Sequence, residues 1–142
     1  MKIFEKAIRA QVCNFLTECN ILNPSQSGFR PKHSTTTTLI NVTDTILDNM
    51  DKGLLKSAVF LDLKKAFDTV SHGVLLGKLR INGIQDNELL WFQSYLSDRC
   101  QVTVLDGTTS DCLGTAEGVP QGYVLGPLLL ILYINAKLHY PW

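Results

Sequence analysis

Two carboxylates near the middle of the chain, Asp62 and Asp68, are the first residues whose type and spacing could carry chemistry. Asp62 follows the apolar run Ala58–Leu61, and Asp68 comes six residues later, after a basic pair and Phe67. A carboxylate buried without a partner costs several kcal/mol, so Asp62 should lie at a strand end and face a cation. The spacing suits a metal-binding acid, followed by a turn that brings Phe67 and Asp68 back toward it. An Asp that caps the following turn or helix fits the local pattern equally well.

A glycine-rich turn and a basic loop are two further candidates. Gly118-Val119-Pro120-Gln121-Gly122 is a stiff turn whose two glycines would let the backbone come close to a ligand. The loop Gln26–Ser34 holds Arg30 and Lys32, two cations that could face phosphate. Each segment also has a simpler interpretation. The first could be an ordinary loop before a buried helix, and the second a polar loop with an aromatic anchor.

The elements that must position these residues alternate between helices and strands, which indicates an α/β (α+β) fold in two layers. The continuous apolar run at Ala58–Leu61 predicts a strand covered on both faces. Asp106-Gly107 is a hairpin signal, and we expect the Ala58–Leu61 strand beside that hairpin. Apolar residues at helical spacing predict core-facing helices over residues 3–20, 35–50, 71–84, 87–96 and 124–133, and the expected hairpin strands cover 101–105 and 111–117.

The composition is that of an ordinary globular protein of about one domain. The chain has 142 residues, 45% hydrophobic and 18% charged, and its formal net charge of zero gives no support to nucleic-acid binding. The first 80 residues carry 11 Lys/Arg against 7 Asp/Glu, an excess that either faces phosphates or is an uneven solvated surface. The longest apolar run, Tyr123–Ile134, is too short to span a membrane. We therefore expect a soluble, intracellular protein.

The four cysteines give no sign of a zinc site. They include no C-x-x-C pair, and no His lies at zinc-ligand spacing. Cys100 and Cys112 could face each other across the hairpin, but in an intracellular protein we expect reduced, packed thiols.

Four motifs, in order along the chain, resemble those of the reverse transcriptases of non-LTR (LINE-type) retrotransposons. Phe60-Leu61-Asp62-Leu63-x-x-Ala66-Phe67-Asp68 is similar to their first palm motif. Gly118-Val119-Pro120-Gln121-Gly122-x-x-Leu125-Gly126-Pro127 is similar to their second palm motif. Gln26-Ser27-Gly28-Phe29-Arg30-Pro31 resembles their fingers motif, and Trp91-Phe92-x-Ser94-Tyr95-Leu96 also fits. The match runs through nearly the whole chain, and it favours a metal-site origin for Asp62.

The resemblance implies a role for each residue of the first palm motif. Asp62 would be the catalytic carboxylate that bridges two Mg²⁺ ions, which activate a primer 3′-hydroxyl and neutralise the triphosphate. Leu63 and Lys64 would offer backbone amides near the phosphates. Phe67 would sit under the sugar and exclude a 2′-hydroxyl, which selects deoxynucleotides. Asp68 would either hold the turn or act directly.

The same resemblance implies positions for the other motifs. Gln121 and Gly122 would line the nucleotide and template side, in one cleft with Asp62 and Phe67, and Arg30 would be a fingers cation near template or phosphate. Residues 1–56 would be fingers-like and residues 57–142 palm-like, with a small antiparallel sheet packed by helices. The implied partners are the RNA template, DNA primer and dNTP of the full-length family, with no membrane and no obligate protein partner.

The sequence also departs from the family pattern. No Asp or Glu follows Glu117, so the aromatic-Ala-Asp-Asp motif that supplies the remaining metal carboxylates is missing. One carboxylate is a poor ligand set for Mg²⁺. Asn135-Ala136 stands in place of a usual Asn-Asp, and Tyr123 in place of a usual Ser. The thumb and the start of the first fingers motif are also missing, so we expect a domain truncated at both ends.

These features lead to one main hypothesis and two alternatives. The main hypothesis is a part of an RNA-directed DNA polymerase, a nucleotidyltransferase, that keeps a remnant of the template and dNTP site and is inactive alone. The alternatives are a non-catalytic nucleic-acid-binding or interaction module that reuses the palm, and a product with no selected role. We also expect the helix over residues 124–133 to be over-exposed in the isolated chain, because the strands that would cover it are missing.

Overall fold

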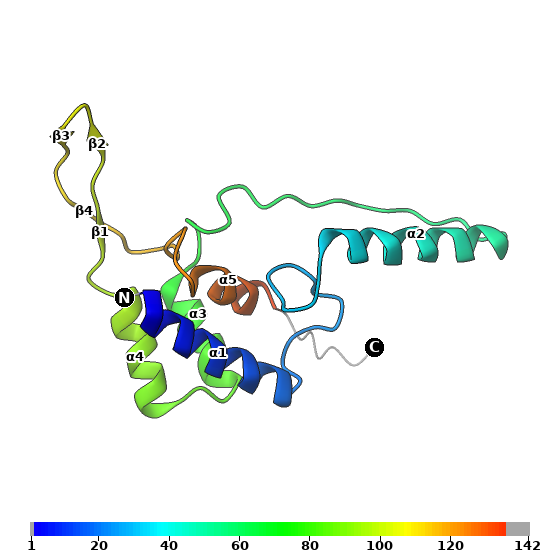
Figure 1. The fold of residues 1–142 in the computed structure, drawn as a ribbon, viewed down its shortest axis with the longest axis horizontal. Helices are drawn as coiled ribbons and strands as arrows, with labels where there is room; N and C mark the ends of the chain where they lie inside the picture. Colours follow the sequence, from blue (N-terminus) through cyan, green and yellow to red (C-terminus); the bar gives the residue numbers. More distant parts are fainter. Residues whose placement is uncertain (1, 136–142) are drawn as a thin grey trace. The chain divides into compact units, whose positions relative to one another are not determined.

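The structure is a computed structural model that describes residues 2–135 (Figure 1). Its elements form two compact units, which we name the α2 unit (Asn23–Lys64) and the helical unit (residues up to Leu22 and from Lys65 onward). All five predicted helices are present. None of the helices within residues 2–135 is both long and apolar enough to cross a membrane. The elements are α1 (Lys2–Glu18), α2 (Thr35–Asp51), α3 (His72–Ile81), α4 (Asp86–Leu96), β1 (Cys100–Gln101), β2 (Val104–Leu105), β3 (Thr108–Thr109), β4 (Leu113–Gly114) and α5 (Gly126–Ile134).

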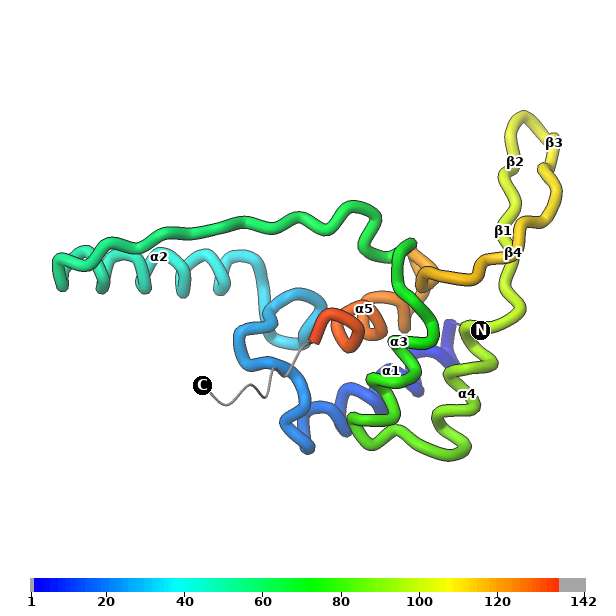
Figure 2. Tube along the Cα trace, turned by 180° about the vertical axis from the view of Figure 1, so that it is seen from behind, coloured from blue at the N-terminus to red at the C-terminus, as the bar shows by residue number. Residues whose placement is uncertain are grey.

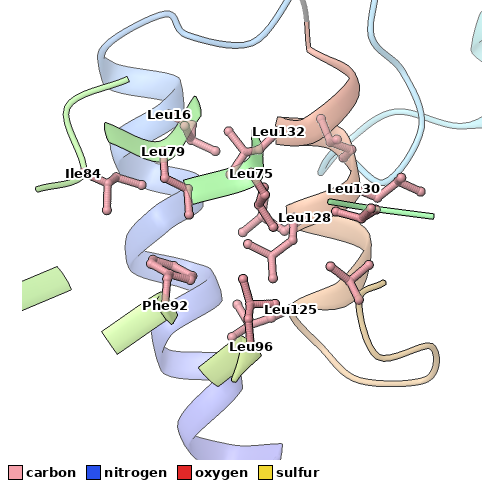
Figure 3. Close-up of a cluster of buried hydrophobic side chains, with 14 of the residues drawn as sticks. Leu16, Leu75, Leu79, Ile84, Phe92, Leu96, Leu125, Leu128, Leu130 and Leu132 are labelled. Carbon is pink, nitrogen blue, oxygen red and sulfur yellow. The ribbon is translucent and has the colours of Figure 1, made fainter. Parts of the chain in front are cut away.

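The core of the helical unit is a leucine-rich cluster to which α1, α3, α4 and α5 all contribute (Figure 3). Helix α5 is apolar on every side and must therefore be covered on every side. Its side chains Leu128 to Leu132 are at most 7% exposed, and Leu16 of α1 and Leu75 of α3 lie beside them in Figure 3. Pro127 falls in the first turn of α5, where its missing N–H is harmless. The expectation that α5 would be over-exposed is wrong, because the neighbouring helices cover it.

A hairpin connects α4 to α5. Strand β1 pairs with β4, and β2 pairs with β3, both antiparallel. Asp106 and Gly107 have positive φ angles of 48° and 78°, as a two-residue hairpin turn requires. The predicted hairpin is confirmed. Its strands are short and exposed, so the expectation of a sheet packed by helices is wrong: the helices pack on one another instead.

A disulfide joins Cys100 to Cys112 in this hairpin. Their Cα atoms are 5.7 Å apart, which is an ordinary separation for a disulfide. The expectation of reduced thiols was based on the usual state of intracellular cysteines, and it is wrong for this pair because the antiparallel ladder brings the two residues together. Cys13 and Cys19 are free thiols.

Helix α2 of the α2 unit begins as the sequence predicts. Ser34 Oγ accepts a hydrogen bond from the Thr37 N–H at 3.1 Å, and Thr37 Oγ1 accepts one from the Ser34 N–H at 3.0 Å. This reciprocal pair is a capping box. No residue of α2 is buried, and Leu39 and Met50 are each 65% exposed. The prediction that the apolar side of α2 faces inward is therefore wrong.

The prediction of a buried strand at Ala58–Leu61 is also wrong. After α2 the chain turns back as an extended segment (Figure 2), but it joins no sheet among residues 2–135. Val59 is 83% exposed, Phe60 91% and Leu61 87%. A covered strand needs neighbours that satisfy its N–H and C=O groups, and the described strands pair only with one another within the hairpin. The apolar run is extended but solvated.

Candidate functional site

The turn predicted after Asp62 is present, and backbone atoms hold it. Lys65 has a positive φ of 54°, and its carbonyl accepts hydrogen bonds from the N–H groups of Asp68 at 2.8 Å and Thr69 at 3.2 Å. Phe67 is half-buried and packs against the core, whereas Asp68 is exposed. No donor to the Asp68 carboxylate is found among the described residues. The Asp68 side chain is therefore not what holds the turn.

This first turn is joined directly to the glycine-rich turn. The Gly118 N–H donates to the Val70 carbonyl and the Val119 N–H donates to the Phe67 carbonyl, both at 2.8 Å. The ring atom Nε2 of His72 lies 2.7 Å from the Gly118 carbonyl, to which it donates. The residues that resemble the first and second palm motifs are far apart in the sequence, yet these hydrogen bonds hold the two turns, residues 65–70 and 118–122, against each other. We call this contact the joint.

Glycine is required at two points of this joint for packing of backbone against backbone. Gly118 has a φ of +90°, and a Cβ atom there would lie 3.1 Å from the carbonyl oxygens of both Phe67 and Asp68. A Cβ atom on Gly126, at the start of α5, would overlap the Pro120 carbonyl oxygen. We expected both glycines of the turn to leave room for a ligand. The structure shows open space beside Gly122 and neighbouring backbone beside Gly118.

Gly122 and Gln121 form the open part of the turn. Gly122 has a φ of +84°, and nothing lies within 4 Å of the position that a Cβ atom would take. Gln121 and Gly122 are both exposed. Because Val119 is hydrogen-bonded to Phe67, these three predicted site residues, Phe67, Gln121 and Gly122, lie in one region of the helical unit.

The residues predicted to handle metal and phosphate belong to the α2 unit. Asp62, Leu63 and Lys64 are exposed; Asp62 and Leu63 end the extended segment after α2, and Lys64 begins the turn that follows it. Their backbone is free of regular structure, so their amides could face a ligand. The convergence of Asp62 with the residues of the helical unit stays a prediction.

Arg30 is half-buried and closes its own loop. Its Nη1 atom donates to the carbonyl oxygens of Asn23 and Gln26, each at 3.1 Å. A guanidinium has five N–H donors, so these two contacts leave others for a phosphate. The structure therefore gives Arg30 a local structural role beside the one that the resemblance implies.

The described residues do not make a Mg²⁺ centre by themselves. Mg²⁺ is usually held by one or two carboxylates together with substrate phosphates and waters. Within residues 2–135 no three or more His, Cys, Asp or Glu side chains are grouped so that they could hold a metal ion. The exposed Asp62 could supply a ligand to such a centre, but these residues do not fit a two-metal site without further carboxylates.

A cavity of about 770 Å³ lies away from these turns, between α1 and α4. Phe4, Val12 and Phe15 of α1 line it, together with Trp91 and Phe92 of α4. None of the predicted site residues reaches it. It is an open groove between two packed helices, and we do not assign the candidate functional site to it.

The joined turns carry the motif pair of a template-directed polymerase, and comparison with protein families gives the same class. The family described as "Reverse transcriptase (RNA-dependent DNA polymerase)" matches residues 1–139. The chain belongs to this family.

The chain is similar to several transposon proteins of Drosophila melanogaster. It is 34% identical over 138 residues to the probable RNA-directed DNA polymerase from transposon BS, a match that covers 93% of this chain and 14% of that protein. It is 35% identical over 135 residues to the corresponding protein of the X-element, again with 93% and 14% covered. For the RNA-directed DNA polymerase from mobile element jockey, the identity is 34% over 136 residues, covering 94% and 14%. The chain spans 14% of the length of these curated relatives, and no solved structure matches it significantly.

Sequence reasoning missed two residues near the joint. His72 follows Ser71 at the start of a predicted helix, where a polar residue is ordinary, and nothing in the local pattern points to Gly118. Glu5 is buried although it is charged, and between exposed neighbours in the amphipathic N-terminal helix it gives no sign of its contact with a distant segment.

Proposed function

We propose that this chain forms the part of a non-LTR retrotransposon reverse transcriptase that contacts the primer–template and the incoming dNTP. The observation that carries the proposal is the pair of backbone hydrogen bonds that joins the two motif turns, Gly118 to Val70 and Val119 to Phe67. In this arrangement Phe67 would lie under the sugar of the nucleotide. The open turn at Gln121 and Gly122 would line the nucleotide and template side.

The α2 unit would add the charged groups. Asp62 would supply one Mg²⁺ ligand, and the amides of Leu63 and Lys64 would approach the phosphates. Arg30 would face template or phosphate with the donors that its loop leaves free. Bound Mg²⁺ would supply charge neutralisation at the triphosphate. This part of the proposal depends on Asp62 lying next to the joined turns in the working protein.

We further propose that the 142-residue polypeptide does not polymerise DNA by itself. Two-metal phosphoryl transfer needs carboxylates on both ions, and no Asp or Glu follows Glu117 in this sequence. Because each decade of rate corresponds to about 1.4 kcal/mol of barrier, losing that stabilisation should abolish measurable turnover. A purified chain should not extend a DNA primer on an RNA template with Mg²⁺ or Mn²⁺. Template-dependent extension that disappears in Asp62→Ala would contradict this.

Measuring the binding of an RNA–DNA hybrid to the chain distinguishes the proposed function from the alternative that the chain has no role with nucleic acids. We expect weak binding, with dissociation constants of about 10⁻⁴–10⁻⁶ M that weaken steeply as salt rises. Lys64→Ala keeps the backbone amide but removes the exposed ammonium group beside it, so it should weaken the salt-dependent part of binding further. Lys52→Ala is the matched control, because Lys52 Nζ is paired with Asp48 at 2.6 Å outside the motifs.

The outcomes of this binding experiment are distinct. Failure to bind the hybrid at low salt, or equal losses in Lys64→Ala and Lys52→Ala, would overturn the proposed contact. Hybrid binding that is indifferent to added dNTP would favour the non-catalytic module over a polymerase remnant.

A further inference from the structure

Glu5 is an unusual residue in the core of the helical unit. It lies in the first turn of α1 and carries a carboxylate, yet it is only 1% exposed. Charged side chains are almost never fully buried unless they are paired. The described residues give Glu5 no salt bridge, so its burial needs another explanation.

The partner of Glu5 is a backbone amide far away in the sequence. Glu5 Oε2 accepts a hydrogen bond from the Val124 N–H at 2.9 Å. Val124 lies between the glycine-rich turn and α5, whose N-cap residue, Leu125, makes no capping hydrogen bond with its side chain. The first N–H groups of a helix have no partner within the helix, and a negative charge near them is favourable. Glu5 therefore accepts from the N–H just before the N-cap residue and brings a negative charge from α1 close to the start of α5.

An aromatic and cationic cluster, made of Tyr95, Arg99 and Tyr123, lies next to this contact. The Arg99 guanidinium lies 4.4 Å from the ring centroid of Tyr95 and 5.4 Å from that of Tyr123. Arg99 Nε donates to the Tyr95 carbonyl at 2.6 Å. Burial, followed by the negative charge of Glu5, raises the pKa of Tyr95 to about 12. Tyr123 and Val124 directly follow Gly122, so the cluster lies at the end of the glycine-rich turn.

The second carboxylate oxygen of Glu5 does not stabilise the core. Glu5 Oε1 is buried and has no hydrogen-bond partner among residues 2–135. A buried polar atom without a partner destabilises the folded state, and apolar residues of the same size often serve a core as well or better. The carboxylate of Glu5 instead fixes the path of the chain, because its hydrogen bond to the Val124 N–H determines where the chain leaves the turn.

We propose that Glu5 is a positioning residue that holds the Gly118–Gly122 turn, through Val124, in the conformation that presents Gln121 and Gly122. Its importance for nucleotide binding rests on the proposed function, whereas its effect on the turn does not. Glu5 acts only through the backbone of Val124 and touches no reacting group. The N-terminal helix thereby controls a segment 119 positions further along the chain.

The test uses the full chain and NMR of its backbone amides. Glu5→Gln keeps a carbonyl acceptor at the same place, whereas Glu5→Met keeps the size and removes the acceptor. In Glu5→Met we expect the Val124 amide to exchange at least about tenfold faster. The order parameters of Gln121 and Gly122 should fall from about 0.85 toward 0.6. Glu5→Gln should stay close to the wild type in both measurements.

Control variants separate local positioning from general loss of stability. Glu18 lies exposed in the last turn of the same helix, so Glu18→Met should change neither measurement. Amides of α3 should keep their wild-type exchange in Glu5→Met. Unchanged Val124 exchange in Glu5→Met would overturn the proposal, and so would a Glu5→Gln variant that behaves like Glu5→Met. If the wild type fails to bind the RNA–DNA hybrid, the proposed function fails while these measurements still decide the positioning role.

Discussion

Replacing Gly118 by alanine should destabilise the helical unit strongly. A non-glycine residue held at its φ of +90° is strained by about 1–2 kcal/mol. The added methyl group would also meet the carbonyl oxygens of Phe67 and Asp68 at 3.1 Å. These are backbone atoms and cannot rotate aside, so relief must stretch the 2.8 Å bonds from Gly118 to Val70 and from Val119 to Phe67, each of which contributes about 0.5–1.5 kcal/mol. We expect Gly118→Ala to cost about 3 kcal/mol in all.

Gly122→Ala is the matched control for this measurement. Gly122 has nearly the same φ, +84°, but no atom lies within 4 Å of its potential Cβ position, so only the strain of about 1–2 kcal/mol should remain. Urea unfolding followed by circular dichroism gives both free energies of unfolding. With slopes of about 1–3 kcal/mol per M, the two midpoints should differ by roughly 1 M. Equal losses in the two variants would refute the argument that the two turns touch at Gly118.

Two further predictions concern the cluster beside the turn and the hairpin. The pKa of Tyr95 is raised to about 12 in the folded chain from its ordinary 10, so the unfolded chain loses this proton first as the pH rises. The contribution of Tyr95 to the free energy of unfolding is therefore fully present below pH 10 and is lost as the pH rises through 12. Urea unfolding should show that Tyr95→Phe lacks this part of the alkaline loss, and identical pH profiles of the variant and the wild type would count against it. The Cys100–Cys112 bond closes a loop with a sequence separation of 12, and such cross-links contribute up to about 3 kcal/mol. Cys112→Ser should therefore speed amide exchange in β2 and β3 but leave amide exchange in α5 unchanged. Hairpin amides that exchange as slowly in the variant as in the wild type would disprove this.

The sequence predicts local elements well where the signal is itself local. The five helices follow from apolar spacing and from caps such as Ser34, which forms its capping box with Thr37. The hairpin turn follows from Asp106-Gly107, because both residues must take positive φ. The turn after Asp62 is also confirmed, since Lys65, Phe67 and Asp68 lie close together in the chain.

Predictions of burial failed where they depended on distant partners. An apolar run such as Ala58–Leu61 is suited to a buried strand only where other strands flank it. The run itself does not reveal whether such strands are present. The same limit explains α2, whose apolar side is exposed, and α5, which is covered by helices that the local pattern of residues 124–133 does not reveal. Glu5 was missed for a related reason, because its partner Val124 is distant in the sequence and offers only a backbone N–H.

The contact between the two motif turns could be predicted only in part, for the same physical reasons. Motif spacing correctly brought out the two turns, and the bonds of Gly118 and Val119 show that they meet. It gave the wrong reason for Gly118, whose missing side chain makes room for the neighbouring backbone rather than for a ligand. The convergence of Asp62 with these two turns stays a prediction, because no local signal in the sequence determines the distance between two separate units.

The exposed segment after α2 has a consequence for the chain in concentrated solution. Ser57 to Leu61 is an uncharged, extended stretch without Pro or Gly that contains Val59 and Phe60, two residues that favour β-structure. Such stretches tend to add to one another edge to edge as fibrils grow. Lys56 on one side and Asp62 with Lys64 on the other are charges of the kind that interrupt such stacking. Asp62 would then have a second task beside the metal-ligand role that we propose for it, since neutralising it would remove one of the charges that keep neighbouring copies apart.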